Sequence, residues 1–193
     1  MKFFRNKLNE NRFDEVKFIA ADAVSNPWRI ITLLNSDKEL QKIIDVVGVH
    51  YTLKSPVKAL YCGKPIWHSE AWPLMWSKSW KEVPPGGLDF AKTIIETFVK
   101  AKMQAYIMNP FVEAYYPVVP YNTKGCLIAN TPWCGHCEIT NGVWIVAHFT
   151  QFIKPGWKIL DKASMFSKPF YCLTACDPTS QNYCKSLGEI AGI

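Results

Sequence analysis

The amino-acid sequence predicts an α/β fold, in which four parallel strands alternate with helices and a β-rich segment follows. Short apolar runs alternate with stretches of helical spacing, which is typical of a parallel sheet covered by helices. Each apolar run ends in polar or aromatic residues, as strands do at the catalytic end of a (β/α) barrel. Four strands are half of such a barrel and leave open sheet edges, so we expect the chain to be incomplete.

Four segments are predicted as buried strands, because each is a short apolar run that stops at a polar or aromatic residue. They are residues 16–21 before Asp22, residues 45–49 before His50 and Tyr51, residues 64–69 before Glu70, and residues 104–108 before Asn109. Because the carboxyl ends of parallel strands meet at one end of a barrel, these side chains are the first candidates for chemistry.

Helices are predicted where apolar residues recur at helical intervals. These segments are residues 3–13, which suit the end of an amphipathic helix, and residues 30–44, 88–102 and 142–152. Loops are expected up to Gly87 and again between Tyr121 and Gly142. Two short extended candidates, residues 157–160 and 169–174, indicate the start of the β-rich domain.

Composition and charge exclude several classes of protein. Hydrophobic residues make up 49% of the chain, too many for a mostly disordered sequence. The net charge of +6 is spread along the chain without a dense run, so a nucleic-acid partner is not expected. No stretch approaches the roughly 20 apolar residues of a membrane span, and the N-terminus lacks the apolar core of a signal peptide. Seven cysteines, an odd number, leave their pairing and the compartment open.

The residue pattern alone leaves the role of Glu70 open. Trp67 and Trp72 lie close to it in the sequence, and such rings form flat apolar platforms for sugars, although Trp-rich cores exist too. A carboxylate at a strand end can equally cap the following loop. His50 and Tyr51 either donate hydrogen bonds to a neighbouring carboxylate or are buried polar side chains satisfied by the backbone.

Several segments resemble the galactosylceramidase (galactocerebrosidase) family of glycoside hydrolases. The longest is VWIVAHFTQFIKPGW at residues 143–157, and the others are residues 46–51, 64–70, 115–121 and 132–136. The resemblance runs from about Phe4 to Leu160. It implies the C-terminal half of a (β/α)8 TIM barrel, strands 5–8, over residues 1–154, followed by the truncated start of a β-sandwich over residues 155–193.

The resemblance also implies a retaining glycoside hydrolase that removes β-galactose from galactosylceramide. Its nucleophile motif matches Ser69-Glu70, so Glu70 is expected to be the nucleophile. His50, Tyr51, Trp72 and Tyr121 are expected to contact the substrate. No metal and no cofactor are expected. The implied partners are a glycosphingolipid substrate and a sphingolipid activator protein, and the implied location is the lysosome.

The sequence departs from the family at the acid/base and at two further places. The family's acid/base is the glutamate of an Asn-Glu pair that ends the fourth barrel strand. Asn9-Glu10 does not match it, because no apolar strand leads into this pair, so we predict that the acid/base is absent and that these residues alone have negligible turnover. Met108-Asn109 stands where the family has a tryptophan wall. The family's cysteine after the nucleophile strand is missing around residues 85–87, so its disulfide pattern does not carry over.

Two alternatives to catalysis at Glu70 follow from the sequence. The first is an inactive remnant that binds a glycan or a partner chain. The second is a thiol oxidoreductase, because residues 133–137, Trp-Cys-Gly-His-Cys, reproduce the active-site string of disulfide isomerases through Cys134 and Cys137. That motif acts only where it follows a strand and opens a helix, and Asn141-Gly142 should stop a helix there. Cys134, His136 and Cys137 are too close together for a full tetrahedral zinc site.

Overall fold

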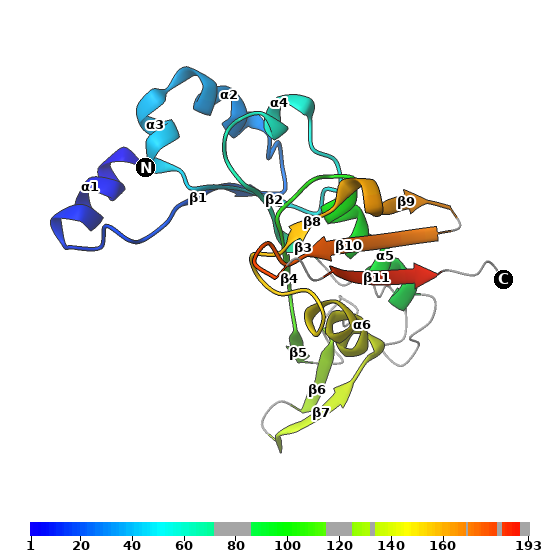
Figure 1. The fold of residues 1–193 in the computed structure, drawn as a ribbon. Helices are drawn as coiled ribbons and strands as arrows, with labels where there is room; N and C mark the ends of the chain where they lie inside the picture. Colours follow the sequence, from blue (N-terminus) through cyan, green and yellow to red (C-terminus); the bar gives the residue numbers. More distant parts are fainter. Residues whose placement is uncertain (72–85, 115–124, 132–133, 169, 181–182, 190–193) are drawn as a thin grey trace. The chain divides into compact units, whose positions relative to one another are not determined.

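The computed structural model describes residues 1–71, 86–114, 125–131, 134–168, 170–180 and 183–189 (Figure 1). The chain divides into two compact units. Unit 1 consists of Met1–Ala71 and Ala101–Ile107, and unit 2 consists of Trp72–Lys100 and Met108–Ile193. Most of the loop expected before Gly87 lies outside the described residues.

The sheet of unit 1 has the strand order β1-β2-β3-β4, which is also the order along the chain. Its strands are β1 Ile19–Ala23, β2 Val46–His50, β3 Ile66–Ala71 and β4 Ala105–Met108. Strands β1 and β2 pair in parallel, and so do β2 and β3. The predicted α/β fold is therefore confirmed, and the parallel sheet is that of a partial barrel.

Helices α1 (Lys2–Glu10), α2 (Arg29–Ser36), α3 (Lys38–Ile43) and α4 (Val57–Leu60) belong to unit 1. Alternate residues of β2 point to opposite faces of the sheet. Val47 and Val49 are fully buried in the core of the unit, which also holds residues of α2 and of the segment that leads into β4. The buried members of this core are Ala20, Ile31, Leu34, Ile44, Val47, Val49, Ala59, Cys62, Ile66, Ala101 and Met103.

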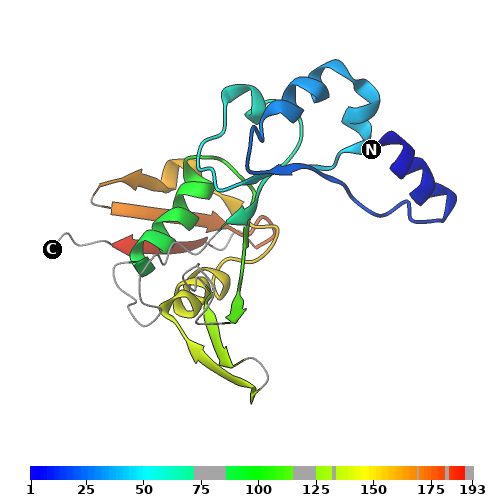
Figure 2. The same ribbon diagram turned by 180° about the vertical axis from the view of Figure 1, so that it is seen from behind.

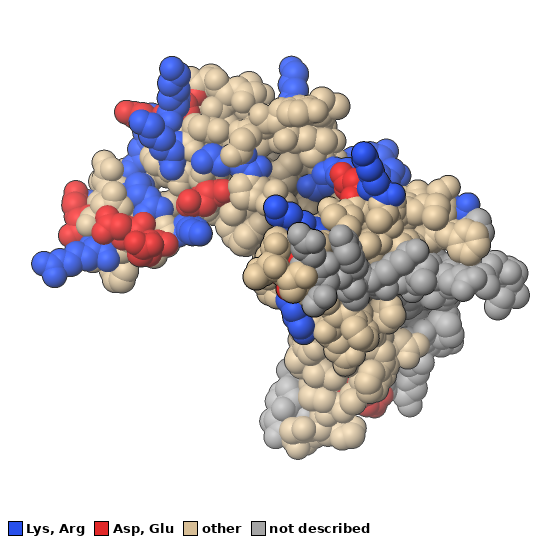
Figure 3. All heavy atoms as spheres, viewed as in Figure 1, with Lys and Arg blue, Asp and Glu red and all other residues tan. Residues whose placement is uncertain are grey.

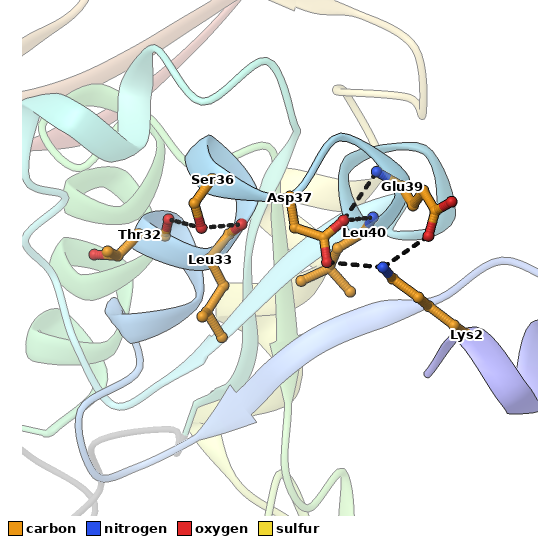
Figure 4. Close-up of polar contacts among 7 residues, drawn as sticks. All are labelled: Lys2, Thr32, Leu33, Ser36, Asp37, Glu39 and Leu40. Atoms are coloured by element: carbon orange, nitrogen blue, oxygen red, sulfur yellow. Dashed lines mark hydrogen bonds and ion pairs between the residues drawn. The ribbon is translucent and has the colours of Figure 1, made fainter.

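The single helix predicted over residues 30–44 is wrong, because the chain breaks it at Asp37. Asp37 has an extended backbone, with φ −123° and ψ 101°, and its carboxylate accepts hydrogen bonds from the backbone N–H groups of Glu39 and Leu40 at 3.0 Å each. Asp37 thus caps the start of α3. Lys2 of α1 pairs with Asp37 at 3.0 Å and with Glu39 at 2.7 Å (Figure 4). Hydrogen bonds from Leu40 and Lys2 hold the pKa of Asp37 below its usual value.

Unit 2 contains two helices, α5 (Gly86–Val99) and α6 (Asn141–Thr150), close to the predicted segments. Its larger sheet has the order β11-β10-β8, with β9 also pairing with β10, and all of these pairs are antiparallel. These strands are β8 Lys158–Ile159, β9 Met165–Ser167, β10 Phe170–Cys176 and β11 Tyr183–Glu189, with a 3-10 turn at Asp161–Ala163. The predicted β-rich segment is therefore present, whereas the domain boundary at residue 154 stays a prediction.

Helix α5 lies against this sheet (Figure 2). Phe90 and Ile95 on α5 are fully buried, and Lys92 lies over the ring of Tyr171, with its Nζ 5.5 Å from the ring centroid. A second, three-stranded sheet is formed by β5 Val112–Ala114, β6 Leu127–Thr131 and β7 His136–Ile139. The loop expected between Tyr121 and Gly142 was wrong in part, because β6 and β7 fall within it.

The surface carries charges of both signs. In the view of Figure 3, the Lys and Arg side chains lie singly or in small groups among Asp and Glu, without forming one continuous basic surface. Among the helices that the structure describes, none has the length and apolar character needed to cross a membrane.

Candidate active site

The carboxyl ends of three neighbouring strands in unit 1 bring four polar side chains together. Asp22 lies in β1, His50 ends β2, Tyr51 follows it, and Glu70 lies near the end of β3. Both strand pairings are irregular here. The register of the β1–β2 pair shifts between Ala21 and Ala23, and that of the β2–β3 pair shifts between Val49 and His50. Such irregularities change the direction in which side chains point and occur next to active sites.

The carboxylate of Glu70 has a contact at each oxygen. The Tyr51 hydroxyl donates a hydrogen bond to Oε1, and Nδ1 of His50 lies 3.5 Å from Oε2. The backbone N–H of Tyr51 also donates to the backbone carbonyl of Glu70 at 3.1 Å, which ties the ends of β2 and β3 together. The Glu70 side chain is 30% exposed. The carboxylate is therefore oriented by its neighbours and still accessible to a substrate.

His50 joins Glu70 to Asp22. Its Nε2 lies 2.9 Å from Oδ1 of Asp22, and its side chain is only 12% exposed. Burial opposes ionisation of Asp22, but hydrogen bonds from Ser69 and His50 and the charge of His50 outweigh it, so the pKa of Asp22 falls below its usual value. Asp22 is thus an ionised hydrogen-bond acceptor at neutral and mildly acidic pH.

Three non-glycine residues at this site have left-handed backbones. The φ angles are 67° at Ala21, 44° at Asp22 and 51° at Tyr51. Such conformations cost on the order of 1–3 kcal/mol each and cluster at functional sites, where the surrounding structure enforces them. Here they occur at Asp22, which contacts His50, at its neighbour Ala21, and at Tyr51, which contacts Glu70.

His68 lies in β3, two residues before Glu70, and is 2% exposed. Its ring packs edge-on against Tyr106 of β4, with the centroids 5.2 Å apart. Burial, and secondarily the charge of His50, lowers the pKa of His68 to about 4. The imidazole is therefore neutral throughout the mildly acidic range.

This buried histidine should make the stability of the fold depend on pH. Between pH 6.5 and about 4 the unfolded chain binds a proton at residue 68 that the folded chain does not. The free energy of unfolding should therefore fall as the pH is lowered through this window, by roughly 3 kcal/mol in total, and level off below it. Urea unfolding of the wild type and of His68→Gln at several pH values measures this. His68→Gln should lose most of the pH dependence of its free energy of unfolding. His136→Gln changes an exposed histidine and should keep this dependence. An equal pH dependence in all three proteins would refute the assignment.

The structure brings together three of the five predicted site residues, Glu70, His50 and Tyr51. Trp72 and Tyr121 lie outside the described residues, so their substrate contacts stay predictions. Asp22 was noted in the sequence as a strand-end side chain but was assigned no role at the site. Glu10, whose pair with Asn9 does not match the acid/base motif, lies on the exposed surface of α1 and pairs with Lys7.

The disulfide-isomerase string does not have the local structure that its chemistry requires. Cys134 and Cys137 are both exposed, and Cys137 lies in β7, which pairs antiparallel with β6. No helix begins at Cys134; the next helix starts only at Asn141. The thiol oxidoreductase alternative therefore loses its structural basis. Within the described ranges, no group of three His, Cys, Asp or Glu side chains is placed to hold a metal ion.

Comparison with known proteins identifies the family of this chain. The model of glycosyl hydrolase family 59 matches residues 1–151. Galactocerebrosidase from dog (Canis lupus familiaris) is 36% identical over 169 residues, covering 87% of this chain, and the human protein is 32% identical over 170 residues, also covering 87%. The chain spans 24% of the length of each of these relatives.

Solved structures share the fold at low sequence identity. SrfJ from Salmonella typhimurium has a TM-score of 0.69 at 14% identity, covering 90% of this chain and 40% of its own. The glycoside hydrolase family 30 xylanase Xyn30A from Clostridium acetobutylicum has a TM-score of 0.63 at 19% identity, covering 91% of this chain and 42% of its own. The family match over residues 1–151 and the identity to the galactocerebrosidases together show that this chain belongs to glycosyl hydrolase family 59.

Proposed function

We propose that this chain carries the nucleophile of a retaining glycoside hydrolase that removes β-galactose from galactosylceramide and related glycosphingolipids. The observation that supports this most directly is the carboxylate of Glu70, which lies at the carboxyl end of β3 with Tyr51 on one oxygen and His50 on the other. The names of the galactocerebrosidase relatives support the choice of sugar and lipid.

In the proposed first step, an oxygen of Glu70 attacks the anomeric carbon of galactose. A C–O bond forms to Glu70 while the bond to the ceramide oxygen breaks and a general acid protonates that oxygen. In the second step, the group that gave up its proton takes a proton from water, whose oxygen attacks the same carbon, releases galactose and returns the bond electrons to Glu70. Tyr51 orients the carboxylate for the attack, because its hydroxyl donates to Oε1.

The general acid must be a second carboxyl group about 5–5.5 Å from the nucleophile. Asp22 is unsuited to this role, since its pKa lies below the usual value and its carboxylate is occupied by Ser69 and His50. Glu10 is also unsuited, because it lies on helix α1 and not at a strand end. We therefore propose that the acid/base lies outside residues 1–193, and that these residues alone do not turn over the natural lipid.

The remaining elements of the proposal follow from the family. Residues 1–154 are proposed as barrel strands 5–8, and residues 155–193 as the start of a β-sandwich. A glycosphingolipid substrate, a sphingolipid activator protein and a lysosomal location are proposed with them. Binding of a glycan or a partner chain without catalysis is the second candidate, favoured because neither Asp22 nor Glu10 suits the role of acid/base.

The proposal is tested with 2-deoxy-2-fluoro-β-galactosyl fluoride. Fluoride leaves without help from a general acid, so this reagent tests the nucleophile separately from the missing acid/base. Intact-mass spectrometry should show one fluorogalactosyl group per chain, and peptide mapping should place it on Glu70. A label on another carboxylate would overturn the assignment. Absence of any label, with galactose binding still seen by saturation-transfer NMR, would favour the glycan-binding alternative.

A further inference from the structure

Asp22 has no role in the reaction described above, yet it is one end of a chain of three side chains. Its Oδ1 lies 2.9 Å from Nε2 of His50, whose Nδ1 lies 3.5 Å from Oε2 of Glu70. The three residues come from three neighbouring strands, and the backbone irregularities of β1 and β2 both occur where they meet. The contact with His50 of the neighbouring strand therefore holds the Asp22 side chain in place.

The hydrogen-bonding properties of Asp22 determine which nitrogen of the His50 imidazole carries a proton. An ionised carboxylate can only accept hydrogen bonds, so Nε2 must carry a proton to bond with Asp22. Nδ1 then faces Glu70, whose ionised carboxylate also only accepts, so Nδ1 acts as a donor to it when both ring nitrogens carry protons. Among the described residues, the other titratable groups near the ring are His68, whose pKa is lowered in part by the charge of His50, and Tyr51, whose ring centroid lies 5.7 Å from that of His50.

Asp22 itself is restrained in two ways. Ser69 of β3 donates a hydrogen bond to it, and its left-handed backbone, φ 44°, belongs to the region that aspartate and asparagine tolerate better than most residues. A carboxylate restrained in this manner can fix the orientation and protonated nitrogen of a histidine, as second partners do for metal-bound and catalytic histidines.

We propose that Asp22 is a positioning residue for the nucleophile: it holds His50 through Nε2–H so that Nδ1 faces the carboxylate of Glu70. This inference rests on the proposed function of Glu70. Asp22 does not touch the reacting atoms, and it acts by restricting the ring of His50, which together with Tyr51 orients the attacking oxygen. Loss of that restriction should slow the attack on the sugar more than it weakens sugar binding.

The contact itself can be tested without catalysis. The chain has four histidines, so their ring nitrogens can be followed in a long-range ¹H–¹⁵N spectrum, with His50→Gln used to assign the His50 signals. In the wild type, Nε2 of His50 should show the shift of a protonated nitrogen throughout the pH range measured. In Asp22→Asn the amide group can donate its own N–H to Nε2 of His50. Nε2 should then no longer carry a proton throughout the pH range. An unchanged Nε2 signal in Asp22→Asn would overturn the proposal.

The kinetic test uses the rate of labelling by 2-deoxy-2-fluoro-β-galactosyl fluoride. Asp22→Asn should lower the maximal labelling rate about 10- to 100-fold with little change in the concentration for half-maximal rate, and Asp22→Glu should recover part of the loss. Glu10→Gln removes an exposed carboxylate of α1 and should label like the wild type. Wild-type labelling at Glu70 with equal rates in Asp22→Asn would overturn this inference and leave the nucleophile assignment intact.

Two controls keep the outcomes separate. The signal of the buried His68 reports whether unit 1 of Asp22→Asn still folds. If it does not, the state of Nε2 in the wild type and the labelling rate of Asp22→Glu decide the question. If the wild type is not labelled at all, the proposed function fails, while the NMR result still decides whether Asp22 holds His50.

Discussion

Replacing Glu70 with glutamine should abolish covalent labelling and lower any turnover of an activated galactoside by at least about 10⁴-fold, as removal of a nucleophile does in other covalent mechanisms. Glutamine keeps the size of the side chain and can still accept a hydrogen bond from Tyr51, so the strand end should remain folded. What it lacks is the anionic oxygen that forms the bond to the sugar. Glu39→Gln, which removes an exposed carboxylate paired with Lys2, should behave like the wild type.

The stereochemistry of an azide reaction tests the same assignment more sharply. With 2,4-dinitrophenyl β-galactoside, whose leaving group needs no proton, the wild-type chain should release about one equivalent of dinitrophenolate and then slow down, because no general base activates water. Added azide should attack the galactosyl-Glu70 ester and give β-galactosyl azide with renewed release of dinitrophenolate. Formation of α-galactosyl azide would show a single displacement, and Glu70 would then not be the nucleophile.

Replacing Gly48 with valine should destabilise the fold by about 3 kcal/mol, with Gly48→Ala causing a smaller loss, because side chains added to a filled interior force strain. Gly48 is buried in the middle of β2. A Cβ atom at this position would lie 2.7 Å from Cγ2 of Ile19 and 2.7 Å from Oγ of Ser69, and 3.1 Å from Cβ of Ser69. The neighbouring strands on both sides of β2 would have to move.

Urea unfolding of Gly48→Ala, Ile19→Ala and the double variant measures this effect. Ile19→Ala removes one of the three atoms that the new methyl group meets, so the double variant should be more stable than the sum of the single changes predicts. Additive effects would show that Ile19 does not limit the space at Gly48. Because Ser69 also donates to Asp22, Gly48→Ala should in addition slow labelling at Glu70.

Part of the site was predictable because it depends on local pattern. Apolar runs that stop at polar residues placed Glu70, His50 and Tyr51 at strand ends, and parallel pairing then made them neighbours. The contact of Asp22 with His50 was not predictable, since it depends on two shifts of strand register that leave no mark in hydrophobic periodicity.

The errors in the predicted fold have similar causes. The helix break at Asp37 arises from a side chain that competes with the helical backbone, while the apolar positions on either side keep their spacing. Strands β6 and β7 are only five and four residues long, too short for alternation to distinguish them from a loop. The sequence of Cys134–Cys137 is identical to a redox motif, but strand β7 occupies the place where that motif requires a helix.

The order in which unit 1 is assembled has a consequence for its synthesis. Ala101 and Met103 belong to its core, and the N–H of Gln104 donates to the carbonyl of Ile66 at 2.8 Å, yet residues 72–100 belong to the other unit. A ribosome adds about 5–20 residues per second, so roughly 2–7 s pass between the synthesis of Ala71 and that of Ile107. During this interval the newly made edge of β3 has no partner strand, and a nascent chain in that state presents a binding site for chaperones.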